Sequence, residues 1–182
     1  KTAYEIRNCD WSSDVCSSDL LGLSPFLAEL IEKSPALAGE AFTGIAESLS
    51  GDQLFQRYHS FLQAQEAEDF AVSLRKLRER EMMRIVYRDL SRTADLFETT
   101  TELSYLADFC VQQALDFSYR EATDRYGVPL DAKGEPEQLI VLAMGKLGAF
   151  ELNLSSDIDL VFLYTDTGRS EEHTSELQSQ FR

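Results

Sequence analysis

The hydrophobic pattern of this 182-residue chain changes once, and the change constrains its fold more than any other feature. Over residues 21–126, apolar residues recur at three- and four-residue intervals, which predicts amphipathic helices. Two continuous apolar runs follow, Leu139–Met144 and Ile158–Tyr164, and such runs are typical of buried strands. The sequence therefore predicts an α+β fold, in which a helical region (residues 21–136) leads into the first strands of a second domain (residues 137–168).

Local signals predict where the first helices begin. Ser24-Pro25 and Ser34-Pro35 each combine a capping serine with a proline that suits the first helical position. Ser50-Gly51-Asp52 breaks the pattern before the next helix.

The later helices are longer. We expect one from about Gln65 to Leu90 and another that starts at a capping box of Thr99 with Glu102. Gly127 ends the last helix, since glycine is the preferred residue just past a helix terminus. The polar stretch 131–136 then predicts a turn.

The two ends, residues 1–20 and 169–182, have no apolar period and can be back-translated into opposite strands of one DNA sequence. That DNA resembles a common short-read sequencing adapter. The match between the two ends extends to the last three residues. When codons are chosen for Ile6–Cys9, their reverse complement encodes Gln180-Phe181-Arg182. We interpret both ends as translated adapter around an insert, Leu21–Gly168, expect residues 1–20 to be disordered, and exclude both ends from fold reasoning. Coding DNA without this inverted repeat would contradict the interpretation.

Composition excludes several classes of protein. The chain carries 32 Asp and Glu against 17 Lys and Arg, a formal net charge of −15, whereas a nucleic-acid coat needs a basic face. No apolar run approaches the roughly 20 residues that span a bilayer. We therefore expect neither nucleic acid nor a membrane as partner.

Outside the adapter ends the only cysteine and histidine are Cys110 and His59, which excludes a disulfide framework and favours the cytoplasm.

Several residues are expected to have structural roles. Cys110 is predicted to be a small buried residue, and His59 has no partner at ligand spacing. We expect core packing, and no base stacking, of the tyrosines Tyr58, Tyr87, Tyr105 and Tyr119.

The most informative residues lie between the two apolar runs. Asp157 and Asp159 are two apart at the start of the second run, so in a strand both carboxylates point to one face. Neighbouring carboxylates repel each other unless a cation lies between them. Mg²⁺ takes oxygen ligands, commonly one or two carboxylates plus substrate phosphates. The pair therefore predicts a magnesium site for phosphoryl or nucleotidyl chemistry.

The loop before this pair adds groups that suit a phosphate. Gly145 and Gly148 allow close backbone approach and positive φ, and Lys146 supplies a point charge. Ser155 and Ser156 add hydroxyl donors. An isolated pair of aspartates before a strand is also an ordinary turn, and it is the combination with the glycines, serines and flanking apolar runs that favours the metal site. Neither the P-loop nor the dinucleotide fingerprint is present.

Leu142–Tyr164 closely resembles the bifunctional glutamine synthetase adenylyltransferase/adenylyl-removing enzyme family, above all in Gly145-Lys146-Leu147-Gly148 and Ser155-Ser156-Asp157-Ile158-Asp159. The form Glu151-Leu152-Asn153 resembles the N-terminal, adenylyl-removing half of that family, as does the upstream stretch 74–85. One departure is Ala149-Phe150, where the family usually has small residues.

The resemblance implies a nucleotidyltransferase domain of polymerase-β type, truncated here, that acts in nitrogen assimilation. Inorganic phosphate would remove AMP from a modified tyrosine of glutamine synthetase and release ADP. Asp157 and Asp159 would be catalytic and hold Mg²⁺, with Gly145, Lys146, Gly148, Ser155 and Ser156 at the nucleotide and phosphate. The implied partners are glutamine synthetase, a PII signalling protein and ADP or ATP. A third carboxylate would come from a later strand, so the chain alone is expected to be inactive.

Two alternatives stay open: the adenylyl-transferring half, which uses ATP as donor, and a non-catalytic module that only senses nucleotide. The basic residues of the stretch 75–88 also allow two interpretations. They form either a solvated face paired with Glu79 and Glu81 or a docking face for phosphate or an acidic partner.

Overall fold

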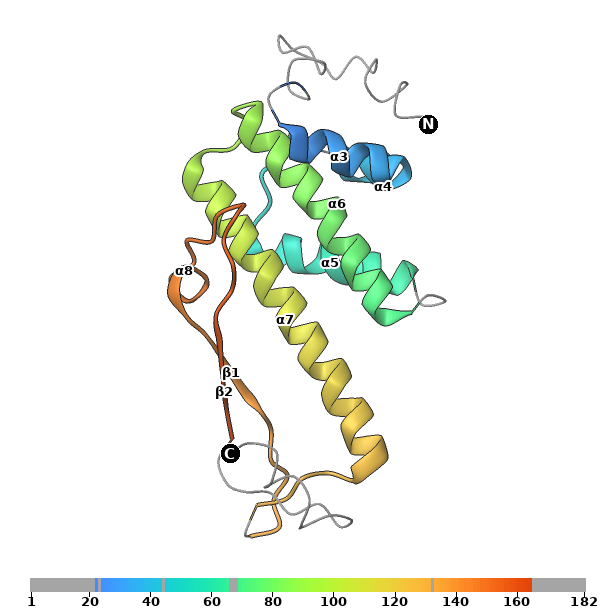
Figure 1. Ribbon diagram of the computed structural model, residues 1–182, viewed down its shortest axis with the longest axis vertical. Helices are drawn as coiled ribbons and strands as arrows, with labels where there is room; N and C mark the ends of the chain where they lie inside the picture. Colours follow the sequence, from blue (N-terminus) through green and yellow to red (C-terminus); the bar gives the residue numbers. More distant parts are fainter. Residues whose placement is uncertain (1–21, 23, 44, 66–68, 132, 165–182) are drawn as a thin grey trace. The chain divides into compact units, whose positions relative to one another are not determined.

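The structure is a computed structural model, shown in Figure 1, and it describes residues 22, 24–43, 45–65, 69–131 and 133–164. This part is mostly helical and ends in a small antiparallel sheet, which confirms the α+β prediction. The interpreted adapter ends, residues 1–20 and 169–182, lie outside the described residues, so their origin and expected disorder stay predictions. No helix in the described ranges is long and apolar enough to cross a membrane.

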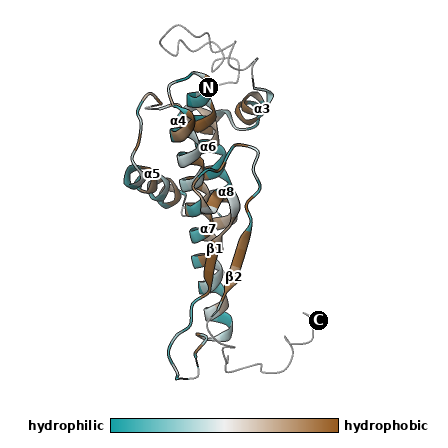
Figure 2. Cartoon of the chain, turned by 90° about the vertical axis from the view of Figure 1, so that its left-hand side faces the viewer, coloured by the Kyte–Doolittle hydropathy of each residue, from teal (hydrophilic) through white to brown (hydrophobic). Residues whose placement is uncertain are grey.

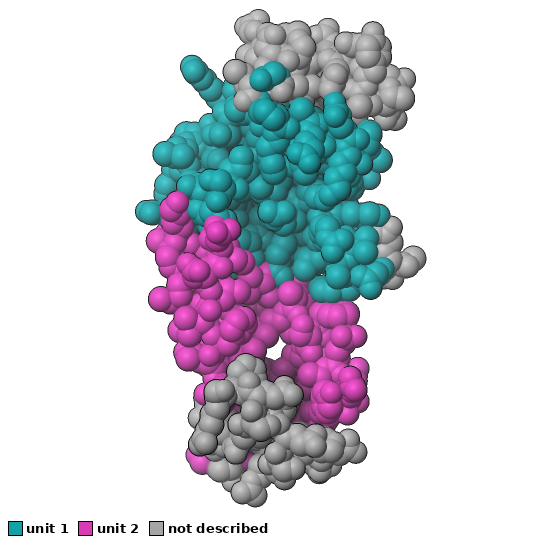
Figure 3. All heavy atoms as spheres, viewed as in Figure 1, with its two compact units in different colours: residues 1–110, 150–156 teal, residues 111–149, 157–182 magenta. Residues whose placement is uncertain are grey.

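The chain divides into two units, coloured separately in Figure 3. Unit 1 contains Lys1–Cys110 and Phe150–Ser156, and unit 2 contains Val111–Ala149 and Asp157–Arg182.

Unit 1 begins with two short helices, α3 (Pro25–Lys33) and α4 (Pro35–Ala41), which start at the predicted prolines. Ser24 Oγ accepts a hydrogen bond from the Leu27 amide at 3.2 Å, as a capping serine should. Ser34 makes no such bond, and its hydroxyl donates to the Glu79 carboxylate at 3.5 Å. Both helices pack on α6 (Phe70–Leu90) through a buried apolar cluster: Leu27, Ile31, Ala38, Ala41, Phe42, Met83 and Val86.

Helix α5 (Gly51–Ala64) starts at the predicted break. Ser50 and Gln53 form a reciprocal capping box, with the Ser50 amide donating to Gln53 Oε1 at 2.8 Å. Gly51 is required by packing, because a Cβ there would lie 2.8 Å from the ring of Tyr105. The next helix, α6, begins at Phe70 and not near Gln65, since Asp69 caps it by accepting from the Val72 amide.

Helix α7 (Leu96–Tyr126) corrects one prediction. The expected capping box of Thr99 and Glu102 is wrong, because the helix already begins at Leu96 and both residues lie inside it. Asp95 Oδ1 accepts from the Glu98 amide at 2.8 Å instead. The helix ends where predicted, as Gly127 takes a left-handed φ of 79°.

Unit 2 holds the sheet, in which β1 (Ile140–Ala143) pairs antiparallel with β2 (Leu160–Leu163). Ile140 lies opposite Leu163, and Ala143 opposite Leu160. Before β1, Asp131 closes the predicted turn by accepting from the amides of Lys133 and Glu135, each at 2.8 Å. Tyr119 on α7 donates its hydroxyl to the Glu137 carbonyl at 3.0 Å and so fixes the approach to β1.

The prediction that both strands are buried is wrong. Both are strongly apolar, as Figure 2 shows, yet Ile140, Leu142 and Phe162 are 46%, 45% and 57% exposed. The sheet has only two strands within the described ranges, so most of its apolar side chains stay in contact with solvent. A continuous apolar run thus predicted the strands correctly but not their burial, because burial depends on further elements that cover the sheet.

Candidate functional site

The connection between β1 and β2 carries the predicted site. Met144 is followed by α8 (Gly145–Gly148), a single helical turn where the sequence predicted a glycine-rich loop. The two glycines are required by the backbone. Gly145 takes a left-handed φ of 57°, and a Cβ on Gly148 would collide with the carbonyl oxygen of Ala143. Glycine therefore permits a tight turn directly after β1.

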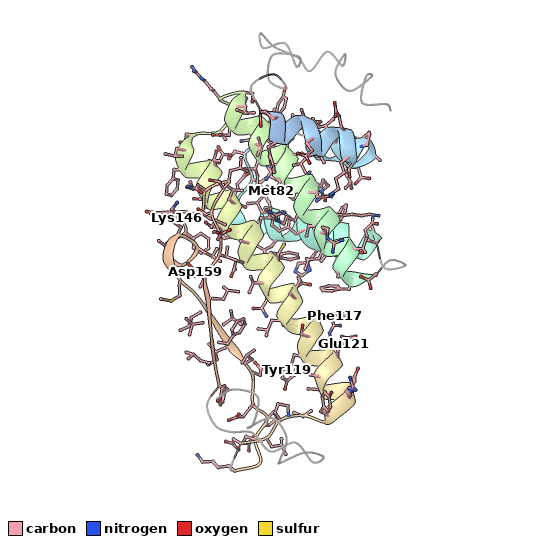
Figure 4. The ribbon with its side chains drawn as sticks, in the orientation of Figure 1. Met82, Phe117, Tyr119, Glu121, Lys146 and Asp159 are labelled. Carbon is pink, nitrogen blue, oxygen red and sulfur yellow. The ribbon has the colours of Figure 1, made fainter. Side chains whose placement is uncertain are left out.

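The aspartates lie just before β2, not inside it. The strand begins at Leu160, so Asp157 and Asp159 occupy the non-helical stretch that leads into it. The Asp159 carbonyl accepts from the Met144 amide at 2.9 Å, which places the backbone of Asp159 beside the residue that precedes α8. Both aspartates are exposed, and so is Lys146, which is labelled with Asp159 in Figure 4. The shared direction of the two carboxylates stays a prediction.

The two serines belong to unit 1 and form the predicted turn. The Ser156 amide donates to the Asn153 carbonyl at 3.1 Å, and its hydroxyl donates to Asn153 Oδ1 at 2.5 Å. Ser155 is exposed. Asn153 therefore orders the turn, and Ser155 presents its side chain to solvent.

One contact of this loop was missed by the sequence analysis. Ser104 Oγ accepts from the Leu152 amide at 3.1 Å, and Phe150 packs edge-on against Tyr105 with ring centroids 5.1 Å apart. The available signal was a serine between Leu103 and Leu106 on the apolar side of a helix, where a polar side chain needs a partner.

The acidic pair, Asp157 and Asp159, would offer a metal its carboxylate oxygens. Carboxylate oxygens are hard ligands, and exposed ones are accessible to an ion that also binds substrate. Within the described ranges no group of three or more His, Cys, Asp or Glu side chains is placed to hold a metal. Two exposed carboxylates suit Mg²⁺ by the chemistry of their donor atoms, and binding of the ion by Asp157 and Asp159 stays a prediction.

Three arginines of the basic stretch of α6 fit neither interpretation offered for it. Arg80, Arg84 and Arg88 are only 7%, 1% and 1% exposed, so these three form neither a solvated nor a docking face. Arg75 and Arg78 are exposed, which fits the solvated interpretation for those two.

We name the buried ion pairs around one carboxylate the Glu81 cluster; its members are Arg57, Arg80, Glu81, Arg84 and Glu102. Arg57 Nε and Arg80 Nε donate to Glu81 Oε1 at 2.9 and 2.8 Å, and Arg84 Nε donates to Oε2 at 2.8 Å. Arg84 also donates to both oxygens of Glu102, at 2.8 and 3.3 Å. The cluster links α5, α6 and α7 inside unit 1.

Burial and charge compete for the ionisation of these groups. Burial opposes charge on Glu81, yet Arg80, Arg84 and Arg57 together hold the pKa of its carboxyl below the usual value. Tyr58 lies beside them, and its buried hydroxyl has no hydrogen-bond partner in the described part of the chain. Burial, reinforced by Glu81, raises the pKa of Tyr58. The surrounding guanidinium groups thus favour the ionised form of Glu81, which is a fixed part of the fold.

The single cysteine and histidine of the insert behave as structural residues. Burial raises the pKa of the Cys110 thiol to about 11, although the residue is only half-buried. The His59 ring packs edge-on against Phe109 with centroids 4.8 Å apart. Among the residues described, neither belongs to a group of three or more possible metal ligands.

Comparison with known proteins identifies the family. The family model described as glutamate-ammonia ligase adenylyltransferase matches residues 17–181. The chain belongs to this family. The matched range also takes in part of both ends, and the adapter origin of those ends stays a prediction.

The similar proteins bear the name bifunctional glutamine synthetase adenylyltransferase/adenylyl-removing enzyme. One from Thioalkalivibrio sulfidiphilus is 41% identical over 151 residues, 81% of this chain and 16% of the relative. One from Pseudomonas aeruginosa is 37% identical over 177 residues, 97% of this chain and 17% of the relative. The chain thus spans about one sixth of the length of these relatives.

Proposed function

We propose that this chain is part of an enzyme that removes AMP from a tyrosine of glutamine synthetase. Inorganic phosphate attacks the phosphorus of the AMP group, the bond to the tyrosine oxygen breaks, and ADP and free tyrosine result. The observation that carries the proposal is the acidic pair Asp157 and Asp159, placed after a glycine turn in a chain 37–41% identical to bifunctional enzymes with this named activity.

Each residue of the site has a role that its chemistry supports. Asp157 and Asp159 would hold Mg²⁺, which when bound neutralises charge on the phosphoryl oxygens. The exposed Lys146 ammonium would bind a phosphate oxygen as a point charge. The backbone at Gly145 and Gly148 leaves room for close approach, and the exposed Ser155 hydroxyl would donate to the nucleotide.

Ser156 requires a change in the predicted role. Because its hydroxyl proton is directed to Asn153, it would act by ordering the turn before Asp157. Direct donation from Ser156 to a phosphate would require this hydrogen bond to break.

We assign the chain to the adenylyl-removing half because Glu151-Leu152-Asn153 and the stretch 74–85 resemble that half. Glutamine synthetase would be the protein substrate, a PII protein the regulatory partner and the cytoplasm the compartment. Because the chain spans only about one sixth of its relatives' length, these activities are assayed in a full-length relative.

The test uses a full-length relative, such as the Pseudomonas aeruginosa enzyme, with asparagine at the positions aligned with Asp157 and Asp159. Both activities are assayed: phosphate-dependent release of ADP from adenylylated glutamine synthetase, and transfer of AMP from ATP. We expect the first to fall by at least about 100-fold, the scale on which removal of one transition-state charge contact acts, with the second retained. Loss of transfer alone would assign the chain to the transferring half. Retention of both would contradict a catalytic role for the pair.

A further inference from the structure

Two arginine side chains of unit 1 share a single carboxylate oxygen. Arg57 Nε on α5 and Arg80 Nε on α6 donate to the same atom, Glu81 Oε1, at 2.9 and 2.8 Å. Arg80 Nη2 also lies 2.6 Å from that oxygen but makes no hydrogen bond with it. Arg57 Nη2 and Arg80 Nη2 are both buried, and neither has a hydrogen-bond acceptor within the described ranges. Buried donors in proteins are normally bound by a protein group, a water or an ion, so these two atoms need an acceptor.

The Glu81 cluster carries more positive than negative charge, since its three arginines face only two glutamates. Arg84 is well compensated: it donates to both carboxylates, and although burial opposes its charge, Glu81 and Glu102 raise the pKa of Arg84. Arg80 is not, because burial, reinforced by the charge of Arg57, lowers the pKa of Arg80 in spite of Glu81. The uncompensated charge therefore lies at Arg57 and Arg80, together with the donors that lack acceptors.

The setting of these two side chains suits an anion. The Arg80 guanidinium lies 4.2 Å from the centroid of the Phe61 ring, a contact that covers its face and leaves the N–H groups in its plane for an acceptor. Glu40 acts on Arg80 more weakly than the other charged groups do, and it is exposed, so solvent screens its charge. The Arg57 side chain is 24% exposed and that of Arg80 9%, so the pair reaches solvent at Arg57.

We propose that Arg57 and Arg80 bind a small oxyanion, which accepts hydrogen bonds from Nη2 of both side chains and balances the uncompensated charge. A guanidinium edge is a planar fork that matches the oxygens of a phosphate or a carboxylate. Because both Nη2 atoms are buried, the ion enters at Arg57 by a movement of that side chain. Such an enclosed ion site differs from a docking face, which would need exposed arginines. The site is independent of the proposed function, since the acidic pair and the glycine turn take no part in it.

The test is a titration of the 182-residue chain with sodium phosphate, observed by NMR through the Nε–H signals of the arginines. Sodium chloride and sodium acetate at matched ionic strength form two further arms. We expect phosphate to shift the signals of Arg57 and Arg80 until they saturate. Arg57→Gln removes one of the two forks and should weaken binding, observed at Arg80, by at least about tenfold, the factor that corresponds to one lost hydrogen bond to a charged group. Arg78→Gln is the matched control, because Arg78 is an exposed arginine of the same helix, and binding should not change.

The arms separate the sources of the anion. Saturation by acetate at lower concentrations than by phosphate would support the site and assign it to the carboxylate of a small organic acid. Equal shifts in chloride would overturn the inference, because they would report general screening of charge. The absence of a shift in all three arms would overturn it as well, since a water molecule would then be the acceptor. Should Arg57→Gln lose its helical circular dichroism, Arg57→Lys, which keeps the charge without the planar fork, is measured by the same criteria. Unchanged binding in the variant would contradict the role of Arg57.

Discussion

Carboxylates are placed in two opposite ways in this chain. Glu81 is completely buried in unit 1, and both of its oxygens accept hydrogen bonds from arginines. Asp157 and Asp159 are exposed in unit 2, and neither has an ion pair with any residue that the structure describes. The buried Glu81 carboxylate is closed to a ligand because its oxygens are inaccessible and already bound by guanidinium groups, whereas the exposed carboxylates are accessible to a metal. Charge alone therefore does not mark a site; the oxygen atoms must also be accessible.

Removing the central buried carboxylate should give the largest effect. Glu81→Gln would leave Arg57, Arg80 and Arg84 buried beside a neutral amide. Breaking one partner of a buried ion pair costs about 3–5 kcal/mol, so we expect the free energy of unfolding in urea to fall by that amount. Glu79→Gln is the matched control, since its partner Lys33 has a side chain 61% exposed, and about 1 kcal/mol or less is expected. Equal losses of unfolding free energy in the two variants would show that the buried ion pairs of Glu81 stabilise the chain no more than the pair with the exposed Lys33.

Acid should weaken the buried region through the same carboxylate. The pKa of Glu81 is lower in the folded chain than in the unfolded chain, where it is near 4.5. The stability that this carboxylate contributes is therefore complete above pH 4.5 and is lost as the pH falls below that value. We expect the difference in unfolding free energy between the wild type and Glu81→Gln to be largest at pH 7 and to shrink below about pH 4.5. A difference that stays constant down to pH 3 would show that protonation of Glu81 does not cause the loss of stability in acid.

Tyr58 provides a smaller test in the buried region. Its hydroxyl has no hydrogen-bond partner among the residues that the structure describes, so Tyr58→Phe removes an unsatisfied polar group and should leave stability unchanged or raise it by up to about 1 kcal/mol. Because burial raises the pKa of Tyr58 from 10.0, the wild type should also lose stability above about pH 10, where the unfolded chain ionises first. The phenylalanine variant should lose less. A loss of 2 kcal/mol or more at pH 7 would indicate a partner for the hydroxyl.

The smallest change in stability is expected at the proposed site. Asp157→Asn and Asp159→Asn remove charge from exposed positions and should alter the unfolding free energy by no more than about 0.5 kcal/mol. Thermal and urea unfolding measure this. A large destabilisation would show that the aspartates, like Glu81, are structural.

The two regions also differ in what could be predicted from the sequence. Helix starts at Pro25, Pro35 and Gly51 were predictable because caps and prolines act within one turn of the chain. The burial of Arg84 was not, since its partner Glu102 lies 18 residues away on another helix. The prediction of a capping box at Glu102 was wrong because Thr99 and Glu102 have the residue types and spacing of a capping box although both lie inside α7.

In the candidate site the motif predicted residues but not the contacts of the neighbouring loop. The tight turn at Gly145 and Gly148 is confirmed, whereas the roles of Asp157 and Asp159, predicted from spacing and residue type, stay predictions. The contact of Ser104 with Leu152 joins positions 48 apart and was not predictable from local pattern. The exposure of β1 and β2 was missed for the related reason that burial depends on elements remote in sequence.

The central claim, that Asp157 and Asp159 together bind a divalent ion, is tested most directly by Mn²⁺ titration of the 182-residue chain observed by NMR. Paramagnetic broadening reports which residues lie near the ion. We expect low Mn²⁺ concentrations to broaden the amides of Asp157, Ile158 and Asp159 first, and expect this selectivity to vanish in the Asp157→Asn, Asp159→Asn double variant. Broadening spread evenly over the acidic surface, or unchanged in the double variant, would contradict the claim.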